Sequence, residues 1–210
     1  MKRDTIQQYT ESLTLSAPQT KQINASYFQQ KSELEIWKEF KSGSEIALIA
    51  IYKHYYKSLY NYTSQFTTDR DLIKDAIHDL FIELIQKRTK LSDTTSIKYY
   101  LFKSIKTNII GKLKKKNLIN LKANLLNGYD FELCFSAEQL MINNQLNTDN
   151  KIKISESLKL LTKKQKEIIY YYYFEGLNLN EISGLMDFTN PKSAQNLLYK
   201  SVKALKKKLL

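Results

Sequence analysis

The stretch from Asp71 to Arg88, DLIKDAIHDLFIELIQKR, decides the fold of this chain. Its apolar residues recur three and four positions apart, the spacing of a helix that packs one broad face into a core. Off that face stands a carboxylate at every fourth position, in Asp71, Asp75, Asp79 and Glu83, which we call the acidic ridge. Like charges at this spacing repel by about 0.2–0.5 kcal/mol per pair. The ridge is therefore either a solvated helix face or a docking surface for a basic partner protein.

The composition of the whole chain is that of a basic helical protein. Its 210 residues include 33 Lys and Arg against 21 Asp and Glu, a formal net charge of +12. This excess predicts a polyanionic partner, either nucleic acid or an anionic membrane surface. We find no signal peptide and no apolar run of about 18 residues, so we expect a cytoplasmic protein without membrane insertion. The single cysteine, Cys134, excludes an internal disulfide and a multi-cysteine metal site.

The pattern of composition along the chain predicts two domains. Residues 1–31 are rich in Ser, Thr and Gln and are expected to form a mobile arm. Residues 32–117 contain helical periodicity, residues 118–151 are rich in Asn and are expected to form a linker, and helical periodicity returns in residues 152–210. With only five Gly and two Pro, a turn-rich β architecture is disfavoured. The expected fold is all-α, with two small helical domains joined by a flexible linker.

Cap residues divide the first part of the chain into helices. Ser32 caps a short predicted helix that ends at Gly43, Ser44 caps a helix from Glu45 to about Phe66, and Thr68 is the expected cap of the ridge helix. The expected core face of the second helix includes Ile46, Ile49, Ala50, Tyr52, Tyr56, Leu59, Tyr60 and Tyr62. Tyrosines at this spacing indicate a core with wet hydroxyl groups more than a ligand site.

Residues 97–116, IKYYLFKSIKTNIIGKLKKK, contain no acidic residue. Ile97, Leu101, Ile105 and Ile109 follow each other at intervals of four and are expected to face the core. The candidate nucleic-acid contacts on the other faces are Tyr99, Tyr100, Phe102, Lys103, Lys106, Asn108 and Lys112. Lysines neutralise phosphate, and aromatic rings stack on unpaired bases. The alternative is a basic helix whose aromatic rings are simply buried.

The last part of the chain has the pattern of a helix-turn-helix. A Thr162–Gln165 capping box opens a helix through about Glu175, and Asn178 caps a short helix that follows. Asp187–Thr189 forms a tight turn, and Pro191 begins the final helix. The exposed candidates for contacts with duplex DNA are Lys192, Ser193, Gln195, Asn196, Tyr199, Lys200 and Lys203. Gln and Asn can hydrogen-bond adenine edges, and Lys can reach guanine or phosphate.

These segments together resemble a bacterial sigma factor of the sigma-70 family. Asp75-Ala-Ile-His78-Asp79-Leu-Phe81 is similar to the polymerase-binding motif of that family, with His78 in place of the usual Gln and Asp79 in place of Glu. The segment from Tyr99 to Asn108 resembles the one that opens and recognises the minus-ten promoter element. Thr162–Leu209 resembles region four, whose helix-turn-helix recognises the minus-thirty-five element. The resemblance is to the compact extracytoplasmic-function type, which keeps only regions two and four.

The resemblance implies a transcription initiation factor that works by binding, without catalytic residues, cofactor or metal. Its polymerase-binding residues would be Asp71, Asp75, His78, Asp79 and Glu83. Core RNA polymerase and promoter DNA are the implied partners, an anti-sigma factor is a further candidate, and the free chain is expected to be a monomer. A helix-turn-helix regulator with a helical sensor or dimerisation domain is the alternative. An enzyme is disfavoured, because His54 and His78 lie on different predicted helices without an evident set of catalytic partners.

Overall fold

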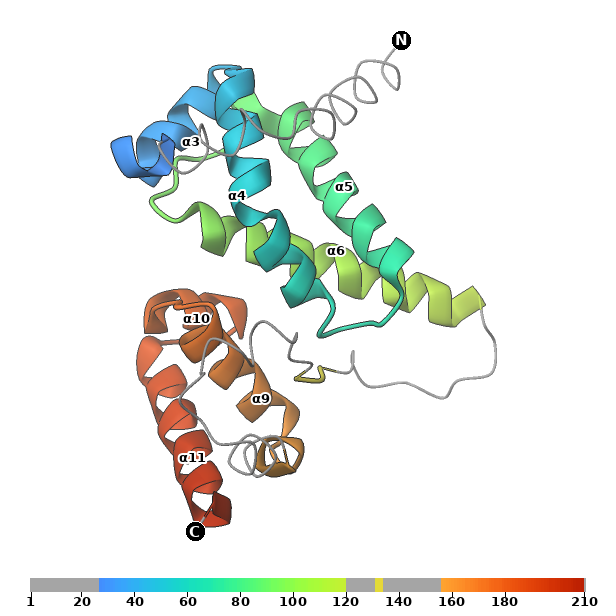
Figure 1. Ribbon diagram of the computed structural model, residues 1–210, viewed down its shortest axis with the longest axis vertical. Coiled ribbons are helices and arrows are strands. Elements are labelled where there is room, and N and C mark those ends of the chain that lie inside the picture. Colours follow the sequence, from blue (N-terminus) through green and yellow to red (C-terminus); the bar gives the residue numbers. More distant parts are fainter. Residues whose placement is uncertain (1–26, 120–130, 134–155, 210) are drawn as a thin grey trace. The chain divides into compact units, whose positions relative to one another are not determined.

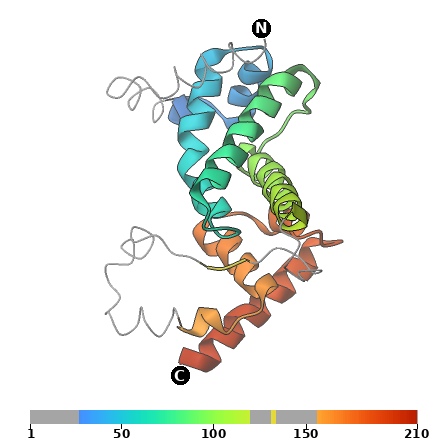
Figure 2. The same ribbon diagram turned by 90° about the vertical axis from the view of Figure 1, so that its right-hand side faces the viewer.

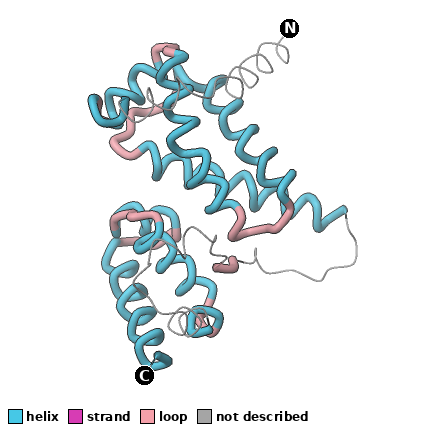
Figure 3. The backbone as a smooth tube through the Cα atoms, viewed as in Figure 1, coloured by secondary structure: helices cyan, strands magenta, loops and turns pink. Residues whose placement is uncertain are grey.

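The computed structural model describes residues 27–119, 131–133 and 156–209, and over these residues the chain contains helices and no strand (Figure 3). The predicted all-α fold is confirmed. The chain divides into two compact units, one of residues 1–60 and 71–108 and one of residues 61–70 and 109–210. Most of the expected arm and linker lies outside the described residues, and the domain limits given above stay predictions.

The first unit is built on a helical hairpin. Helix α3 spans Glu33–Lys41, α4 spans Glu45–Thr63, α5 spans Arg70–Lys87, η1 spans Arg88–Lys90 and α6 spans Ile97–Ile119 (Figures 1 and 2). Residues 61–63 of α4, Arg70 of α5 and residues 109–119 of α6 are counted with the second unit. Helices α4 and α5 form the hairpin, in which the rings of Tyr52 and Phe81 meet with centroids 4.9 Å apart. Because α5 begins at Arg70, Asp69 and not the predicted Thr68 occupies the position directly before it.

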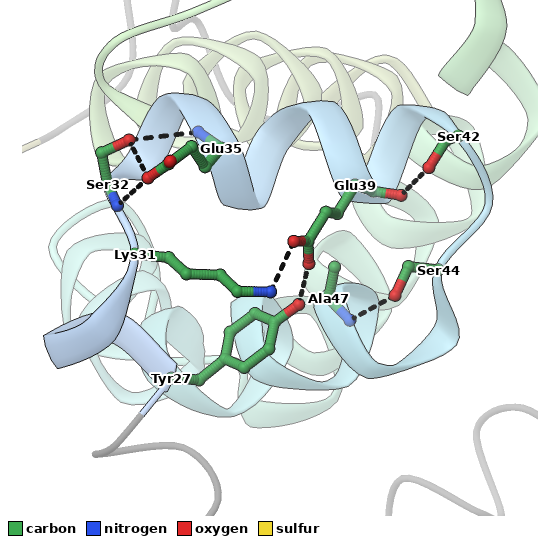
Figure 4. A network of polar contacts seen from close by, with 8 residues as sticks. All are labelled: Tyr27, Lys31, Ser32, Glu35, Glu39, Ser42, Ser44 and Ala47. Carbon is green, nitrogen blue, oxygen red and sulfur yellow. Dashed lines mark hydrogen bonds and ion pairs between the residues drawn. The ribbon is translucent and has the colours of Figure 1, made fainter.

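Two serines fix the starts of α3 and α4, as the sequence predicts. Ser32 and Glu35 form a capping box, in which the Glu35 N–H donates to Ser32 Oγ at 3.3 Å and the Ser32 N–H donates to Glu35 Oε2 at 2.8 Å. The Ala47 N–H donates to Ser44 Oγ at 3.3 Å (Figure 4). Between the two helices, Gly43 takes a φ of 101°, a backbone conformation that strongly favours glycine.

The core of the first unit lies between α3, α4, α5 and α6. Its buried apolar side chains are Ile36, Trp37, Phe40, Ala47, Leu48, Ala50, Ile51, Tyr55, Leu59, Ile73, Ala76, Ile77, Leu80, Phe81, Leu84, Ile97, Leu101, Phe102 and Ile105. Two expectations for the α4 face are corrected. Ile46 is 58% exposed, because the first turn of α4 directs Ala47 and Leu48 into the core instead. Tyr52, Tyr56 and Tyr60 form a half-buried row at the margin of the core.

The second unit contains the predicted helix-turn-helix. Helix α9 spans Lys163–Ile169, the π-helix η2 spans Tyr170–Phe174, α10 spans Leu179–Leu185 and α11 spans Pro191–Leu209. Capping boxes at Thr162 and Asn178 open α9 and α10, which confirms both predicted starts. The helix expected to run to about Glu175 changes at Tyr170 into π-helical geometry, which buries Tyr170 and Tyr171 and leaves the next three aromatic rings exposed.

None of the helices in the described residues is both long enough and apolar enough to cross a membrane.

Candidate functional site

Helix α5 separates its apolar and acidic residues onto opposite sides. Its buried side includes Ile73, Ile77, Leu80 and Leu84. The predicted polymerase-binding residues Asp71, Asp75, His78, Asp79 and Glu83 are all exposed. The acidic ridge is therefore a surface of the first unit and no part of its core.

The acidic ridge has the geometry of a linear binding surface for positive charge. Residues four apart on a helix are separated by about 6 Å along its axis, because each residue rises 1.5 Å. Glu83 forms an ion pair with Lys87, one turn further along α5. Both of these side chains are more than half exposed, so the pair is weak and exchangeable. The arrangement can accept several Lys or Arg side chains from a partner without dismantling the core.

Helix α6 presents part of the predicted basic–aromatic surface. Lys103 is exposed, and its Nζ lies 5.8 Å from the ring centroid of half-buried Tyr99. Lys106, Asn108 and Lys112 are half-buried. Tyr100 is half-buried as well, because its ring packs against Trp37 of α3 with centroids 5.0 Å apart. Tyr99 and Lys103 thus combine an aromatic face and a cation one helical turn apart, which suits a base and its phosphate.

Phe102 corrects the prediction for this surface. Its side chain is fully buried, next to Leu101, which is fully buried too. The Lys98 Nζ lies 5.6 Å from the Phe102 ring centroid. Because other helices pack against two adjacent rows of α6, the core stripe is broader than the single row of every fourth residue. Phe102 therefore belongs to the core and offers no free face for a base.

The candidate DNA-contacting residues of α11 lie along one face of a single helix. Six of the seven are exposed: Lys192, Gln195, Asn196, Tyr199, Lys200 and Lys203. Their spacing of three and four residues places them in a continuous stripe. Ala194 and Ser201 are buried on the opposite side, where Ser201 Oγ donates to the Leu197 carbonyl oxygen at 2.7 Å.

The seventh residue, Ser193, belongs to the helix cap. Its N–H donates to Asn190 Oδ1 at 3.0 Å, and its Oγ lies 3.3 Å from the same oxygen. The turn before this cap contains Asp187, with a φ of 55°. This left-handed backbone conformation is one that Asp adopts more readily than most residues, and it lies in the tight turn that the sequence predicts. The turn and the cap together fix the start of α11.

Two lysines at the far end of α11 are absent from the predicted DNA contacts. Lys206 and Lys207 are exposed and follow Lys203 by three and four residues, so they extend the basic stripe. The signal that indicates them is the absence of any acidic residue after Asp187.

Comparison with known protein families identifies the domain that contains the acidic ridge and most of α6. Residues 51–118 match the family model for sigma-70 region 2. This match covers about a third of the chain. The matched segment includes the acidic ridge and the basic–aromatic helix in the order that the sequence predicts. No curated protein matches the chain by sequence.

Solved structures of sigma factors share the fold of the chain. CnrH, in complex with the cytosolic domain of CnrY, is similar with a TM-score of 0.55 and 12% identity, over 84% of this chain and 96% of CnrH. The sigma factor RpoE from Bartonella quintana, in complex with the anti-sigma factor NepR, is similar with a TM-score of 0.53 and 11% identity, over 75% of this chain and 93% of RpoE. At these identities the likeness is one of fold.

Proposed function

We propose that this protein is a sigma factor of the extracytoplasmic-function type, which binds core RNA polymerase and directs it to specific promoters. The observation that supports this most directly is the match of residues 51–118 to sigma-70 region 2. Within them an exposed acidic ridge on α5 precedes the basic–aromatic helix α6. One domain thus offers a surface for a basic protein and a surface for a nucleic acid.

The acidic ridge is the proposed contact with core polymerase. Asp75, Asp79 and their neighbours on the ridge would pair with Lys or Arg side chains of the polymerase. Charge complementarity of this kind favours rapid and selective association. His78 lies on the same exposed side of α5 and would contribute a ring and hydrogen-bonding nitrogens where other family members present a Gln amide.

Helices α6 and α11 are the proposed contacts with promoter DNA. The α11 stripe around Gln195 and Asn196 would bind the upstream element as a duplex, with Lys192 and Lys200 near phosphates. The Tyr99–Lys103 pair of α6 would hold an unstacked base of the non-template strand in the downstream element. Unstacking a base costs a few kcal/mol, which stacking and phosphate contacts offset.

An anti-sigma factor is a further proposed partner. RpoE, whose fold this chain shares, was solved in complex with the anti-sigma factor NepR. A protein that covered the acidic ridge would prevent polymerase binding, because the same carboxylates are proposed to contact the polymerase.

Run-off transcription tests the proposed function. Purified core polymerase and genomic fragments are combined with and without the protein, and promoter-specific transcripts are expected only in its presence. Reversing two ridge charges, with Asp75→Lys and Asp79→Lys, should abolish co-purification with core polymerase. The double variant Glu45→Lys and Glu132→Lys gives the same net charge at exposed carboxylates outside the ridge and should leave binding unchanged. Equal binding by both double variants would contradict the docking assignment.

A further inference from the structure

Helix α3 makes four contacts with the first turn of α6 and the loop before it. Helix α3 itself lies outside the residues that match sigma-70 region 2. We infer that α3 is a positioning element for the DNA-contacting helix α6, with Glu33 and Trp37 as its main positioning residues. This inference rests on the proposed function of α6. It assigns a role to a helix whose purpose the sequence alone does not indicate.

Glu33 holds the first turn of α6 from a different helix. Its Oε2 accepts a hydrogen bond from the Ile97 N–H at 2.5 Å, and its Oε1 accepts one from the Tyr55 hydroxyl at 2.9 Å. The first turn of α6 contains no acidic residue of its own. A helix begins with unpaired N–H groups and a partial positive charge, both of which a carboxylate stabilises. Glu33 therefore fixes the start of α6 relative to α3 and α4.

Trp37 holds both the preceding loop and the α6 surface. Its indole N–H donates to the Ser92 carbonyl oxygen at 2.9 Å, and its side chain is fully buried. Its ring packs against Tyr100, with centroids 5.0 Å apart. Tyr100 directly follows Tyr99, so the contact sets the rotation of α6 about its axis at the position of the proposed base contact.

A third side chain of α3 secures the same loop from outside. Lys41 Nζ lies 2.6 Å from Asp93 Oδ1, and this hydrogen bond lowers the pKa of the Asp93 carboxyl below its ordinary value. The pair is partly exposed, so its stabilising effect is small compared with the buried contact of Trp37. All four contacts lie at the loop or in the first turn of α6, while the acidic ridge lies on α5. Loss of positioning should therefore impair DNA opening and spare polymerase binding.

The test measures two activities of the full chain with core polymerase, on a promoter identified by the run-off experiment. Promoter opening is followed by permanganate reactivity, and polymerase affinity is measured by titration. Glu33→Ala removes both hydrogen bonds, and Trp37→Phe keeps a ring but removes the N–H donor. Each should reduce opening by about threefold to tenfold, the range of one or two net hydrogen bonds. Polymerase affinity should stay within about twofold of the unchanged protein, since neither residue lies on the ridge.

Two further variants separate positioning from general stability. Glu33→Gln keeps an oxygen that accepts hydrogen bonds and should restore most of the opening lost in Glu33→Ala. Glu39→Ala removes a carboxylate of the same helix whose partners are Tyr27 and Lys31, as Figure 4 shows, and should leave opening unchanged.

Three results decide the outcome. Unchanged opening in Glu33→Ala and Trp37→Phe would overturn the inference while leaving the proposed function intact. Opening and polymerase affinity that fall together, with no rescue by Glu33→Gln, would show a general structural role and also overturn it. Absence of promoter-specific transcription with the unchanged protein would overturn the proposed function itself.

Discussion

His54 on α4 shows how a single residue can report on the packing of the first unit. Its ring stacks on Phe28 with centroids 3.9 Å apart, which anchors the segment before α3 to α4. Burial lowers the pKa of His54 below its ordinary value; the negative charge of Glu33 opposes this shift and the positive charge of Lys98 adds to it. The folded chain therefore binds a proton at His54 less readily than an ordinary histidine does.

The stability of the chain should depend on pH because of His54. Below the ordinary histidine pKa of about 6.5 the unfolded chain binds a proton that the folded chain binds less readily. The free energy of unfolding should therefore fall as the pH is lowered from 7.5 to 5, and His54→Gln should flatten this dependence. Urea unfolding at several pH values measures how the free energy of unfolding depends on pH. His78→Gln keeps His54 and should keep the slope, and an unchanged slope in His54→Gln would refute the assignment.

Asn190 is a second residue whose contribution to stability can be measured by substitution, because it caps a helix. Its Oδ1 accepts the Ser193 N–H at the start of α11. Asn190→Ala should lower the free energy of unfolding by about 1 kcal/mol, the ordinary cost of losing a helix cap. Asn190→Asp, which caps equally well, should have little effect. Thermal unfolding of the three proteins distinguishes them, and equal stability of Asn190→Ala and the unchanged protein would show that this cap is dispensable.

At the scale of the element, the acidic ridge of α5 opposes stability in the free chain. Asp75 has a like charge four residues before it and another four residues after it. Asp75→Asn removes both repulsive pairs and should raise the free energy of unfolding by roughly 0.4–1 kcal/mol. The same substitution should weaken polymerase binding, because the ridge is proposed to be the docking surface.

Urea unfolding and polymerase titration of Asp75→Asn test this opposition between stability and binding. Glu132→Gln, which neutralises an exposed carboxylate outside the helices, should change neither quantity. A lower stability of Asp75→Asn would mean that the chain itself pairs the Asp75 charge, contrary to the role proposed for it.

The helices themselves follow from the sequence because their signals are local. The Ser32 and Asn178 capping boxes and the apolar stripe of α5 depend on residues within a few positions of each other, and all three are found in the structure. Which side chains a neighbouring helix covers depends on contacts across the chain. Phe102 is buried for that reason, and Glu33 gains its role from Ile97, 64 residues further on.

The candidate site was predictable to the extent that it consists of exposed side chains on regular helices. The side chains of the acidic ridge and of the α11 stripe are exposed as predicted. Each of these helices has one apolar face that packs into the core, so its opposite face must point to solvent. The start of η2 was not predictable, since a run of aromatic residues from Tyr170 to Phe174 gives no signal that distinguishes a π-helix from an α-helix. Promoter and polymerase contacts themselves stay predictions.

For the whole molecule, the net charge of +12 predicts that promoter binding depends steeply on salt. Each phosphate contact made by a lysine releases condensed counterions from duplex DNA, so the logarithm of the affinity falls with the logarithm of the salt concentration by about 0.9 per contact. In the proposed complex with core polymerase, the α11 lysines provide some of these contacts. The contribution of each α11 lysine to the salt dependence can be measured separately from the contribution of base-contacting residues to sequence preference.

Lys200→Gln should make the salt dependence shallower by about 0.9 and weaken binding to all sequences alike. Gln195→Ala should leave the salt dependence unchanged but reduce the preference for the promoter over a copy with its upstream element replaced. Lys159→Gln removes an exposed lysine that lies outside α11 and should change neither quantity. Promoter affinity of the polymerase complex, measured at several salt concentrations, tests all three. If Lys200→Gln and Lys159→Gln gave the same salt dependence as the unchanged protein, the α11 stripe would not lie along the DNA backbone, because a lysine that neutralises a phosphate must alter counterion release.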